Sequence, residues 1–285
     1  MSELRAEDIG AAAISTSTIP AEQARRVAAV LDGPGDLTDG DTLPLLWHWA
    51  FFTPAVPTGG LGSDGHPALS ADGPTAGLPR RMWAGGRITS EGGLVIGRPA
   101  TRYSEVVSAV PKSGRSGRLL VVTARHRIEQ DSRVVISEEQ DLVYRTHPTE
   151  PAEGMEAAGP EAAPAGDHRP PAPDGGWADP YVAGPVTLFR YSAVTFNSHR
   201  IHYDQPYARA QEGYPGLVVH GPLTATLLAE SAMRRGATGR SFEFRASAPL
   251  FAGIAFTLVG RPAEAGTELS AVRNDGAVAM TAQLA

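Results

Sequence analysis

Cysteine is absent from the 285 residues. Disulfides, thiolate zinc sites, iron–sulfur clusters and a cysteine nucleophile are therefore excluded, and any chemistry must rest on His, Asp, Glu, Ser or backbone groups. A dominant charge is lacking too, because 25 lysines and arginines stand against 31 aspartates and glutamates. A chain without an overall basic field is poorly suited to a phosphate backbone, so we expect no nucleic-acid partner.

Long apolar runs are also missing. The uncharged stretches are interrupted by Pro, Gly, His or Trp, and the opening Met-Ser-Glu-Leu-Arg-Ala-Glu-Asp is unlike a signal or transit peptide. We therefore expect a cytoplasmic protein with no membrane partner.

Proline and glycine, by contrast, are abundant, with 24 and 32 copies, which excludes a coiled coil or a helical repeat array. Eight of the prolines fall between Pro148 and Pro180 together with five glycines. Such a segment has little to bury and is typical of a linker. We predict an N-terminal domain over residues 1–147, a Pro/Ala/Gly-rich linker over 148–180 and a C-terminal domain over 181–285.

The two halves have similar patterns of expected elements. In the first half, an amphipathic helix is expected at Ala21–Leu31 and an apolar central helix at Leu43–Phe52, capped by Asp41 or Thr42. The alternating or β-branched runs that follow predict strands at Gly86–Ser90, Ala100–Val110, Arg118–Gln130 and Ser132–Arg145.

The second half is predicted to begin with a strand at Val186–Phe196 and a short helix at about Gln205–Gln211. The most apolar helix of the chain, Leu223–Arg234, follows, and then the strands Arg240–Ser247, Ile254–Arg261 and a hairpin around Asn274-Asp-Gly. In both halves a helix precedes a set of antiparallel strands. This predicts an α+β fold, a double hot-dog in which two antiparallel sheets each wrap around a central helix.

Three of the eight histidines, His199, His202 and His220, lie within 22 residues. The same segment holds Asp204 at a predicted helix N-cap and Gly221 at the start of the apolar helix. A base next to backbone N–H donors is what acyl transfer, hydration or dehydration requires.

The segment Phe196-Asn-Ser-His-Arg-Ile-His-Tyr-Asp204, followed by His220-Gly221, resembles the MaoC-like, (R)-specific enoyl-CoA hydratase family. That family has Gly-Asp-x-Asn-Pro-Leu-His-x-Asp and, further on, His-Gly. The likeness is greater to a two-domain subgroup, the mesaconyl-C4-CoA (3-methylfumaryl-CoA) hydratases and the type 2 hydroxyacyl-thioester dehydratases. It extends to the first half, through Leu61-Gly-Ser-Asp-Gly-His-Pro and Leu78-Pro-Arg-Arg-Met-Trp-Ala-Gly-Gly.

The resemblance implies catalytic roles for three residues. Asn197 stands where most of the family have a catalytic Asp, and an amide cannot act as a base. His202 matches the family's catalytic His, so it is expected to be the general base in hydration and the general acid in dehydration. Asn197 would then hold the water or hydroxyl. The backbone N–H of Gly221 or its neighbour would stabilise the thioester oxygen, because Pro222 has no N–H.

Five further residues are expected to bind substrate: His199, Asp204, His220, Arg81 and Trp83. Plainer interpretations stay open, since His199 could only make structural hydrogen bonds, His220 could be a satisfied core histidine and Arg81 could belong to a solvated edge. His199, His202 and Asp204 lack a third imidazole at a recognisable spacing, and hydration of a thioester needs no Lewis acid when an oxyanion hole is present. We expect neither a metal nor a cofactor.

The resemblance implies a hydro-lyase that adds or removes water across the α,β double bond of an acyl thioester, with mesaconyl-C4-CoA hydration favoured. A 3-hydroxyacyl-CoA or acyl-carrier-protein dehydratase is the alternative, and hot-dog folds also serve as thioesterases and non-catalytic acyl-CoA binders. The expected partner is an acyl-CoA or acyl-carrier-protein thioester. If the protein forms a homodimer, a second copy of the chain is its protein partner.

Overall fold

The computed structural model describes residues 12–69, 72–114, 117–146 and 169–285. The chain divides into two compact units. Unit 1 comprises Met1–Ala28 with Pro34–Thr149, and unit 2 comprises Ala29–Gly33 with Glu150–Ala285. No helix within the described ranges is long and apolar enough to cross a membrane.

Unit 1 is built on an antiparallel sheet in the order β1-β3-β4-β5-β2. The strands are β1 (Ala13–Ser17), β2 (Arg80–Ser90), β3 (Ala100–Gly114), β4 (Gly117–Gln130) and β5 (Arg133–Arg145). Asp131 and Ser132, both with positive φ, join β4 to β5. Two consecutive positive φ values define the tight hairpin turn whose twist matches that of the strands.

The helices of unit 1 differ from the sequence expectation. The amphipathic helix α1 (Ala21–Leu31), of which residues 21–28 belong to unit 1, is present, and its residues Ala24, Val27 and Ala28 are buried. The expected central helix Leu43–Phe52 is wrong, because only a short 3₁₀ turn, η2 (Trp47–Ala50), forms there. Leu46 before it is left-handed, with φ 70°, and the backbone of Leu43 pairs with Leu94 instead of continuing a helix. A second 3₁₀ turn is η3 (Thr58–Gly60).

Unit 2 has an antiparallel sheet in the order β7-β10-β9-β8-β6. Its strands are β6 (Trp177–Val182), β7 (Ser241–Ala246), β8 (Ala255–Ala263), β9 (Gly266–Arg273) and β10 (Val278–Leu284). The hairpin expected around residues 274–276 joins β9 to β10. Strand β6 begins inside the range predicted as linker, and residues 148–168 of that range lie outside the described part of the chain.

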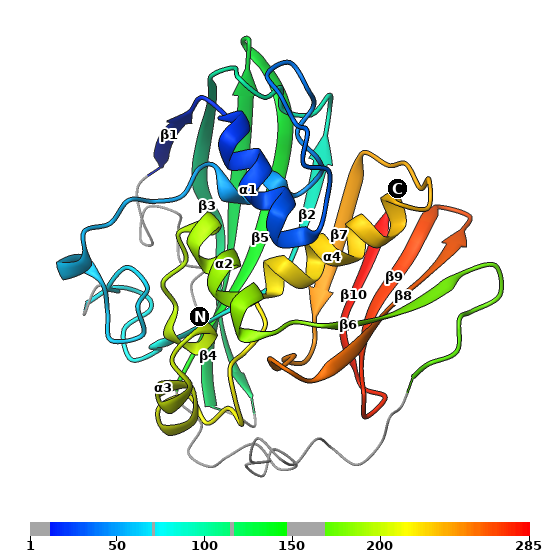
Figure 1. Ribbon diagram of the computed structural model, residues 1–285. Helices are drawn as coiled ribbons and strands as arrows, with labels where there is room; N and C mark the ends of the chain where they lie inside the picture. The colour runs from blue at the N-terminus through cyan, green and yellow to red at the C-terminus, as the bar shows by residue number, and fades with distance from the viewer. Residues whose placement is uncertain (1–11, 70–71, 115–116, 147–168) are drawn as a thin grey trace. The chain divides into compact units, whose positions relative to one another are not determined.

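The helices of unit 2 are α2 (Pro185–Thr195), η4 (Arg200–His202), α3 (Gln205–Ala210) and α4 (Gly221–Met233). Helix α4 buries almost its whole circumference and contacts β7, β8, β9 and β10, across which it runs in Figure 1. The expected strand Val186–Phe196 is wrong. Pro185 opens a helix after Gly184, and the buried residues Leu188, Tyr191 and Ser192 recur at helical spacing. The α+β fold with a sheet and a helix in each half is confirmed.

Candidate active site

The motif segment of unit 2 starts where helix α2 ends. Phe196 adopts the left-handed conformation, with φ 49°. The N–H of Phe196 donates to the carbonyl of Ala193 at 3.4 Å. The N–H of Asn197 donates to the carbonyl of Ser192 at 2.8 Å. This pair of bonds is a Schellman motif, which normally has glycine at the left-handed residue. It fixes the backbone of Asn197 against the last turn of α2.

The side chain of Asn197 is fixed by a second local contact. Its Oδ1 accepts the backbone N–H of His199 at 3.0 Å, an Asx turn that leads the chain into η4. Because a backbone N–H can only donate, the oxygen of the amide must face His199. The NH₂ group is thereby the part of Asn197 that can donate to a ligand.

His202 is buried at the end of η4, and its ring orientation is set by the main chain. Its Nδ1 lies 2.7 Å from the carbonyl oxygen of Val218. A carbonyl only accepts, so Nδ1 carries the proton and the neutral ring has its lone pair on Nε2. The carbonyl is itself held in place, because the N–H of Val218 bonds to Ile201 and Val218 forms a β-bridge with Phe251.

His220 packs flat against His202. The ring centroids are 3.6 Å apart and the planes are inclined by 18°. His220 is completely buried, with Tyr191 beside it, and its Nε2 lies 2.9 Å from the hydroxyl oxygen of Ser192. Its Nδ1 is buried with no hydrogen-bond partner among the described residues. An unpaired acceptor costs less than an unpaired donor, which favours the tautomer in which Nε2–H donates to Ser192.

The charge state of His220 follows from this environment. Burial, and then the nearby histidines His202 and His199, lower the pKa of His220 well below its ordinary value. His220 is therefore neutral at physiological pH. The ring that stacks on His202 adds a flat packing surface without adding a charge.

The other two motif residues, His199 and Asp204, make defined contacts inside unit 2. The ring of His199 meets that of His202 edge to face, with centroids 5.5 Å apart. Asp204 caps α3, where its Oδ1 accepts the N–H of Tyr207 at 3.0 Å and its Oδ2 accepts two bonds from Arg200. The Tyr207 N–H and then Arg200 lower the pKa of Asp204. Both carboxylate oxygens thus accept hydrogen bonds from groups other than His202.

Helix α4 supplies the backbone donors expected of the site. It begins at Gly221, directly after His220, and the carbonyl of His220 accepts the N–H of Thr224 at 3.0 Å. The first N–H groups of a helix have no acceptor within the helix and carry the positive end of its dipole. Gly221, the stacked imidazoles and Asn197 are therefore brought together in one unit.

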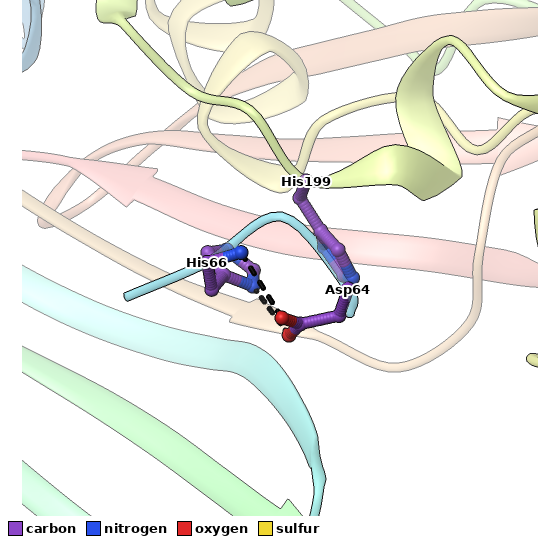
Figure 2. Close-up of side chains that lie close together, drawn as sticks. All are labelled: Asp64, His66 and His199. Carbon is purple, nitrogen blue, oxygen red and sulfur yellow. Dashed lines mark hydrogen bonds and ion pairs between the residues drawn. The ribbon is translucent and has the colours of Figure 1, made fainter. Parts of the chain in front are cut away.

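Arg81 and Trp83, the substrate-binding residues expected in the first half, lie on β2 of unit 1. Trp83 packs edge to face against Trp49, with centroids 5.0 Å apart. Arg81 lies near His66, whose pKa is lowered by burial and, to a smaller degree, by that arginine. Figure 2 shows His66 bonded to Asp64, with 3.1 Å between Nδ1 and Oδ2, so the loop Leu61–Pro67 carries its own carboxylate–histidine pair.

Glu138, a buried carboxylate in unit 1, was not predicted from the sequence. Glu138 on β5 is 3% exposed; its Oε2 accepts His48 Nε2–H at 3.0 Å, and its Oε1 accepts Trp49 Nε1–H at 2.7 Å and Gln140 Nε2–H at 2.8 Å. Burial opposes ionisation, yet His48, with smaller contributions from His126 and Gln140, lowers the pKa of Glu138 to about 2. A detectable signal was its position, since Glu138 shares strand parity with the buried Ile136 and Tyr144.

Ser192 and the carbonyl of Val218 were also missed. Ser192 was hidden by the wrong strand prediction, because only a helix places it with Leu188 and Tyr191 on one buried face. A side-chain pattern carries no signal for a backbone carbonyl, so the partner of His202 could not be found from the sequence. The histidines and Asn197 of the motif lie in unit 2, and their catalytic and binding roles stay predictions.

The chain is similar to proteins of known activity over most of its length. It is 46% identical over 264 residues to mesaconyl-C(4)-CoA hydratase of Chloroflexus aurantiacus, covering 91% of this chain and 90% of that protein. It is 28% identical over 232 residues to the mitochondrial hydroxyacyl-thioester dehydratase type 2 of Schizosaccharomyces pombe, covering 72% of this chain and 73% of that one.

Solved structures agree on the fold. A MaoC-like dehydratase from Phytophthora capsici superposes with a TM-score of 0.70 at 14% identity, covering 99% of both chains. HtdX of Mycobacterium tuberculosis superposes with a TM-score of 0.65 at 17% identity, covering 96% of this chain and 98% of that one. The family model for hydroxyacyl-thioester dehydratase type 2 matches residues 46–252. The resemblance deduced from the motif is therefore confirmed, and the chain belongs to the hydroxyacyl-thioester dehydratase type 2 family.

Proposed function

We propose that the protein hydrates mesaconyl-C4-CoA, adding water across the double bond conjugated with the thioester to give a malyl-type CoA product. The identity of 46% to a hydratase named for that substrate supports the choice of acyl group. The observation that carries the chemistry is the bond from His202 Nδ1–H to the Val218 carbonyl, because it leaves the lone pair on Nε2.

His202 acts as the general base. Its Nε2 takes a proton from water while the water oxygen attacks the β-carbon, and the electron pair of the double bond moves toward the thioester oxygen to form an enolate. Asn197 has no proton to exchange, so the imidazolium of His202 then delivers a proton to the α-carbon and becomes neutral again. One water is consumed, and the C–OH and C–H bonds form on the same face. Dehydration follows the same steps in reverse.

Asn197 and Gly221 hold the reacting atoms. The NH₂ group of Asn197 donates to the water oxygen, which leaves a water proton directed at His202. The N–H of Gly221 at the start of α4 stabilises the negative charge that develops on the thioester oxygen. His220 supports His202 by stacking, and its lowered pKa makes it too weak a base to compete for the proton.

The test is hydration of mesaconyl-C4-CoA by the purified protein. We expect loss of the absorbance of the conjugated thioester and, by mass spectrometry, a product heavier by one water. Hydration in deuterated water adds a stereochemical readout, and NMR of the product should show syn addition. Release of free CoA, detected with a thiol reagent, would instead indicate a thioesterase, and anti addition would contradict the single-base mechanism.

A second candidate is dehydration of a 3-hydroxyacyl-CoA or 3-hydroxyacyl carrier protein. The family description and the relative in S. pombe favour it, because both are named for dehydration of a hydroxyacyl thioester. A panel containing crotonyl-CoA, mesaconyl-C4-CoA and a carrier-protein-bound substrate separates the two. Higher kcat/KM for crotonyl-CoA or the carrier-bound substrate than for mesaconyl-C4-CoA would favour this second candidate.

A further inference from the structure

Two consecutive residues of helix α2, Tyr191 and Ser192, contact His220. The hydroxyl of Ser192 lies 2.9 Å from Nε2 of His220, and the ring centroid of Tyr191 lies 4.9 Å from that of His220, with the planes inclined by 59°. One face of His220 is covered by His202 at a centroid distance of 3.6 Å, so Tyr191 must meet an edge or the other face. The orientation of His220 is therefore set by α2 as well as by His202.

The hydroxyl of Tyr191 connects α2 to helix α4. It hydrogen-bonds with the buried side chain of Thr226. Thr226 already donates its single hydroxyl hydrogen to the carbonyl of Pro222, at 2.9 Å, so Tyr191 must be the donor in this pair. A path of two hydrogen bonds thus runs from α2 through Thr226 to the first turn of α4, at the residue after Gly221.

Tyr191 itself is not a proton-transfer group. Its side chain is buried, and burial raises the pKa of Tyr191 while the hydrogen bond with Thr226 lowers it by a smaller amount, so the phenol keeps its proton at physiological pH. A buried hydroxyl without an acceptor pays the full cost of its lost hydration, which favours keeping the bond to Thr226. Tyr191 therefore contributes position and not acid–base chemistry.

The last turn of α2 also positions Asn197. The N–H of Asn197 donates to the carbonyl of Ser192 at 2.8 Å, and the hydroxyl of Thr195 donates to the carbonyl of Tyr191 at 2.7 Å. A shift of this turn would therefore move Asn197 and the contacts of His220 together. Misplacement of reacting groups by about 1 Å can cost about a hundredfold in rate, so the placement of α2 against α4 matters for hydration.

We propose that Tyr191 is a positioning residue of the candidate active site. Its hydrogen bond to Thr226 holds α2 against α4, and its ring keeps His220 stacked on His202. This inference rests on the proposed function, in which His202 is the base. Tyr191 touches no reacting atom and acts through His220 alone.

The primary experiment breaks the hydrogen bond from each end. Tyr191→Phe keeps the ring beside His220 and removes the donor, whereas Thr226→Val keeps the shape of the side chain and removes the acceptor. A hydrogen bond between neutral groups corresponds to about a twofold to tenfold change in a rate constant. We expect kcat for mesaconyl-C4-CoA to fall by that factor in each variant, with KM changed less than about twofold.

Two further variants of the same pair sharpen the experiment. The double variant should be no slower than the slower single variant, because either substitution removes the same bond. Thr226→Ser keeps the hydroxyl that accepts from Tyr191 and should retain the wild-type kcat. Additive losses or an equally slow serine variant would instead indicate two separate effects on packing.

The matched control is Tyr207→Phe. Tyr207 is also buried in unit 2, and its hydroxyl donates to Glu212 at 3.4 Å. Its ring lies under the guanidinium of Arg200, 4.2 Å from the centroid, so the variant removes a buried hydroxyl without removing a contact to His220. We expect kcat and KM to stay within about twofold of the wild type, because one neutral hydrogen bond is lost away from the imidazoles.

A second readout follows the ring of His202 and needs no substrate. The Nδ1–H of His202, which is donated to the Val218 carbonyl at 2.7 Å, should exchange slowly with water and give an NMR signal that is absent from His202→Asn. In Tyr191→Phe this proton should exchange about twofold to tenfold faster. In Tyr207→Phe its exchange should equal that of the wild type.

Unchanged kcat together with unchanged exchange in Tyr191→Phe and Thr226→Val would overturn the inference, even if both variants lose thermal stability. If Tyr191→Phe does not fold, Thr226→Val decides. Failure of the proposed function is separable, since it appears as absent hydration of mesaconyl-C4-CoA by the wild-type protein. In that case the exchange measurement alone decides whether Tyr191 positions the His202 ring.

Discussion

Units 1 and 2 each contain five antiparallel strands, yet their buried histidines have different hydrogen-bond partners. In unit 2, His202 bonds to a backbone carbonyl and stacks on a neutral histidine. In unit 1, His48 bonds to an ionised carboxylate. A carbonyl orients an imidazole through a neutral acceptor, whereas a carboxylate does so through a charged one. The same architecture thus holds an imidazole against a backbone carbonyl in one unit and against a buried carboxylate in the other.

The largest effect is expected from removing the lone pair of His202. In His202→Asn the amide can still bond to the Val218 carbonyl, as Nδ1 does, but nothing replaces Nε2. General acid–base catalysis contributes about 10²–10⁴-fold, so kcat with mesaconyl-C4-CoA should fall by that factor. Thermal unfolding should stay close to that of the wild type. Near-normal turnover would show that the base lies elsewhere.

The corresponding test in unit 1 is Glu138→Gln, which should reduce stability. Hydrogen bonds to a charged group are worth about 1.5–3 kcal/mol each, and the new NH₂ group would face the donors of Trp49 and Gln140. The midpoint of urea unfolding should fall accordingly. The control is Glu139→Gln, the next residue on β5, whose ion pairs with Arg87 and Arg125 lie at the surface and are worth about 0–1 kcal/mol.

Acid unfolding sharpens the same comparison. Because the folded protein lowers the pKa of Glu138 from 4.5 to about 2, the stabilisation from this group is complete above pH 4.5 and is lost as pH falls toward 2. The difference in unfolding free energy between wild type and Glu138→Gln should therefore shrink over that interval. A constant difference would mean that the charge of Glu138 is not what stabilises unit 1.

A smaller effect is expected at Asn197. Asn197→Ala removes the donor to water and the acceptor for the His199 N–H, so kcat should fall about tenfold to a hundredfold. Asn197→Asp keeps the acceptor and should retain part of the activity. Steady-state kinetics with mesaconyl-C4-CoA measure both variants. If the alanine variant turns over normally, Asn197 does not hold the water.

The smallest effect is expected from Ser192→Ala. This variant removes the partner of His220 Nε2 and should destabilise the protein by about 1 kcal/mol. If His220 positions His202 by stacking, kcat should also fall, by up to about tenfold, with little change in KM. Ser192→Thr keeps the hydroxyl and should restore kcat. Loss of stability with unchanged kcat would mean that His220 contributes only to packing of the core and does not position His202.

What could be predicted from the sequence depended on how local each signal was. Alternating residues on β3, β4 and β5 and the apolar run of α4 are local signals, and all four elements were predicted from them. The strand predicted at residues 186–196 was wrong because β-branched residues obscured the helical spacing of Leu188, Tyr191 and Ser192. The helix predicted at residues 43–52 was wrong because an apolar run has no clear period. The left-handed conformation of Leu46 accompanies a backbone hydrogen bond between Leu43 and the distant Leu94, which the local sequence does not show.

In the candidate site, too, the features that could be predicted from the sequence were those with a local signal. Asn197 and His202 lie in the segment Phe196–Asp204, and Gly221 follows in His220-Gly221, so two short motifs were enough to predict all three as site residues. The Val218 carbonyl and the network around Glu138 join segments that are distant in the sequence, and only folding brings them together. Asp204 was expected at a helix N-cap, and the structure has it there, capping α3.

The left-handed Phe196 also bears on engineering. A non-glycine residue in this conformation costs about 1–2 kcal/mol, and the Phe196 side chain is 62% exposed, so glycine would relax the backbone with little loss of burial. Glycine would, however, also widen the range of backbone angles one residue before Asn197. A gain in thermostability at this position would relax the same backbone restraint that holds Asn197, the residue proposed to bind water, so stability and activity must be optimised together.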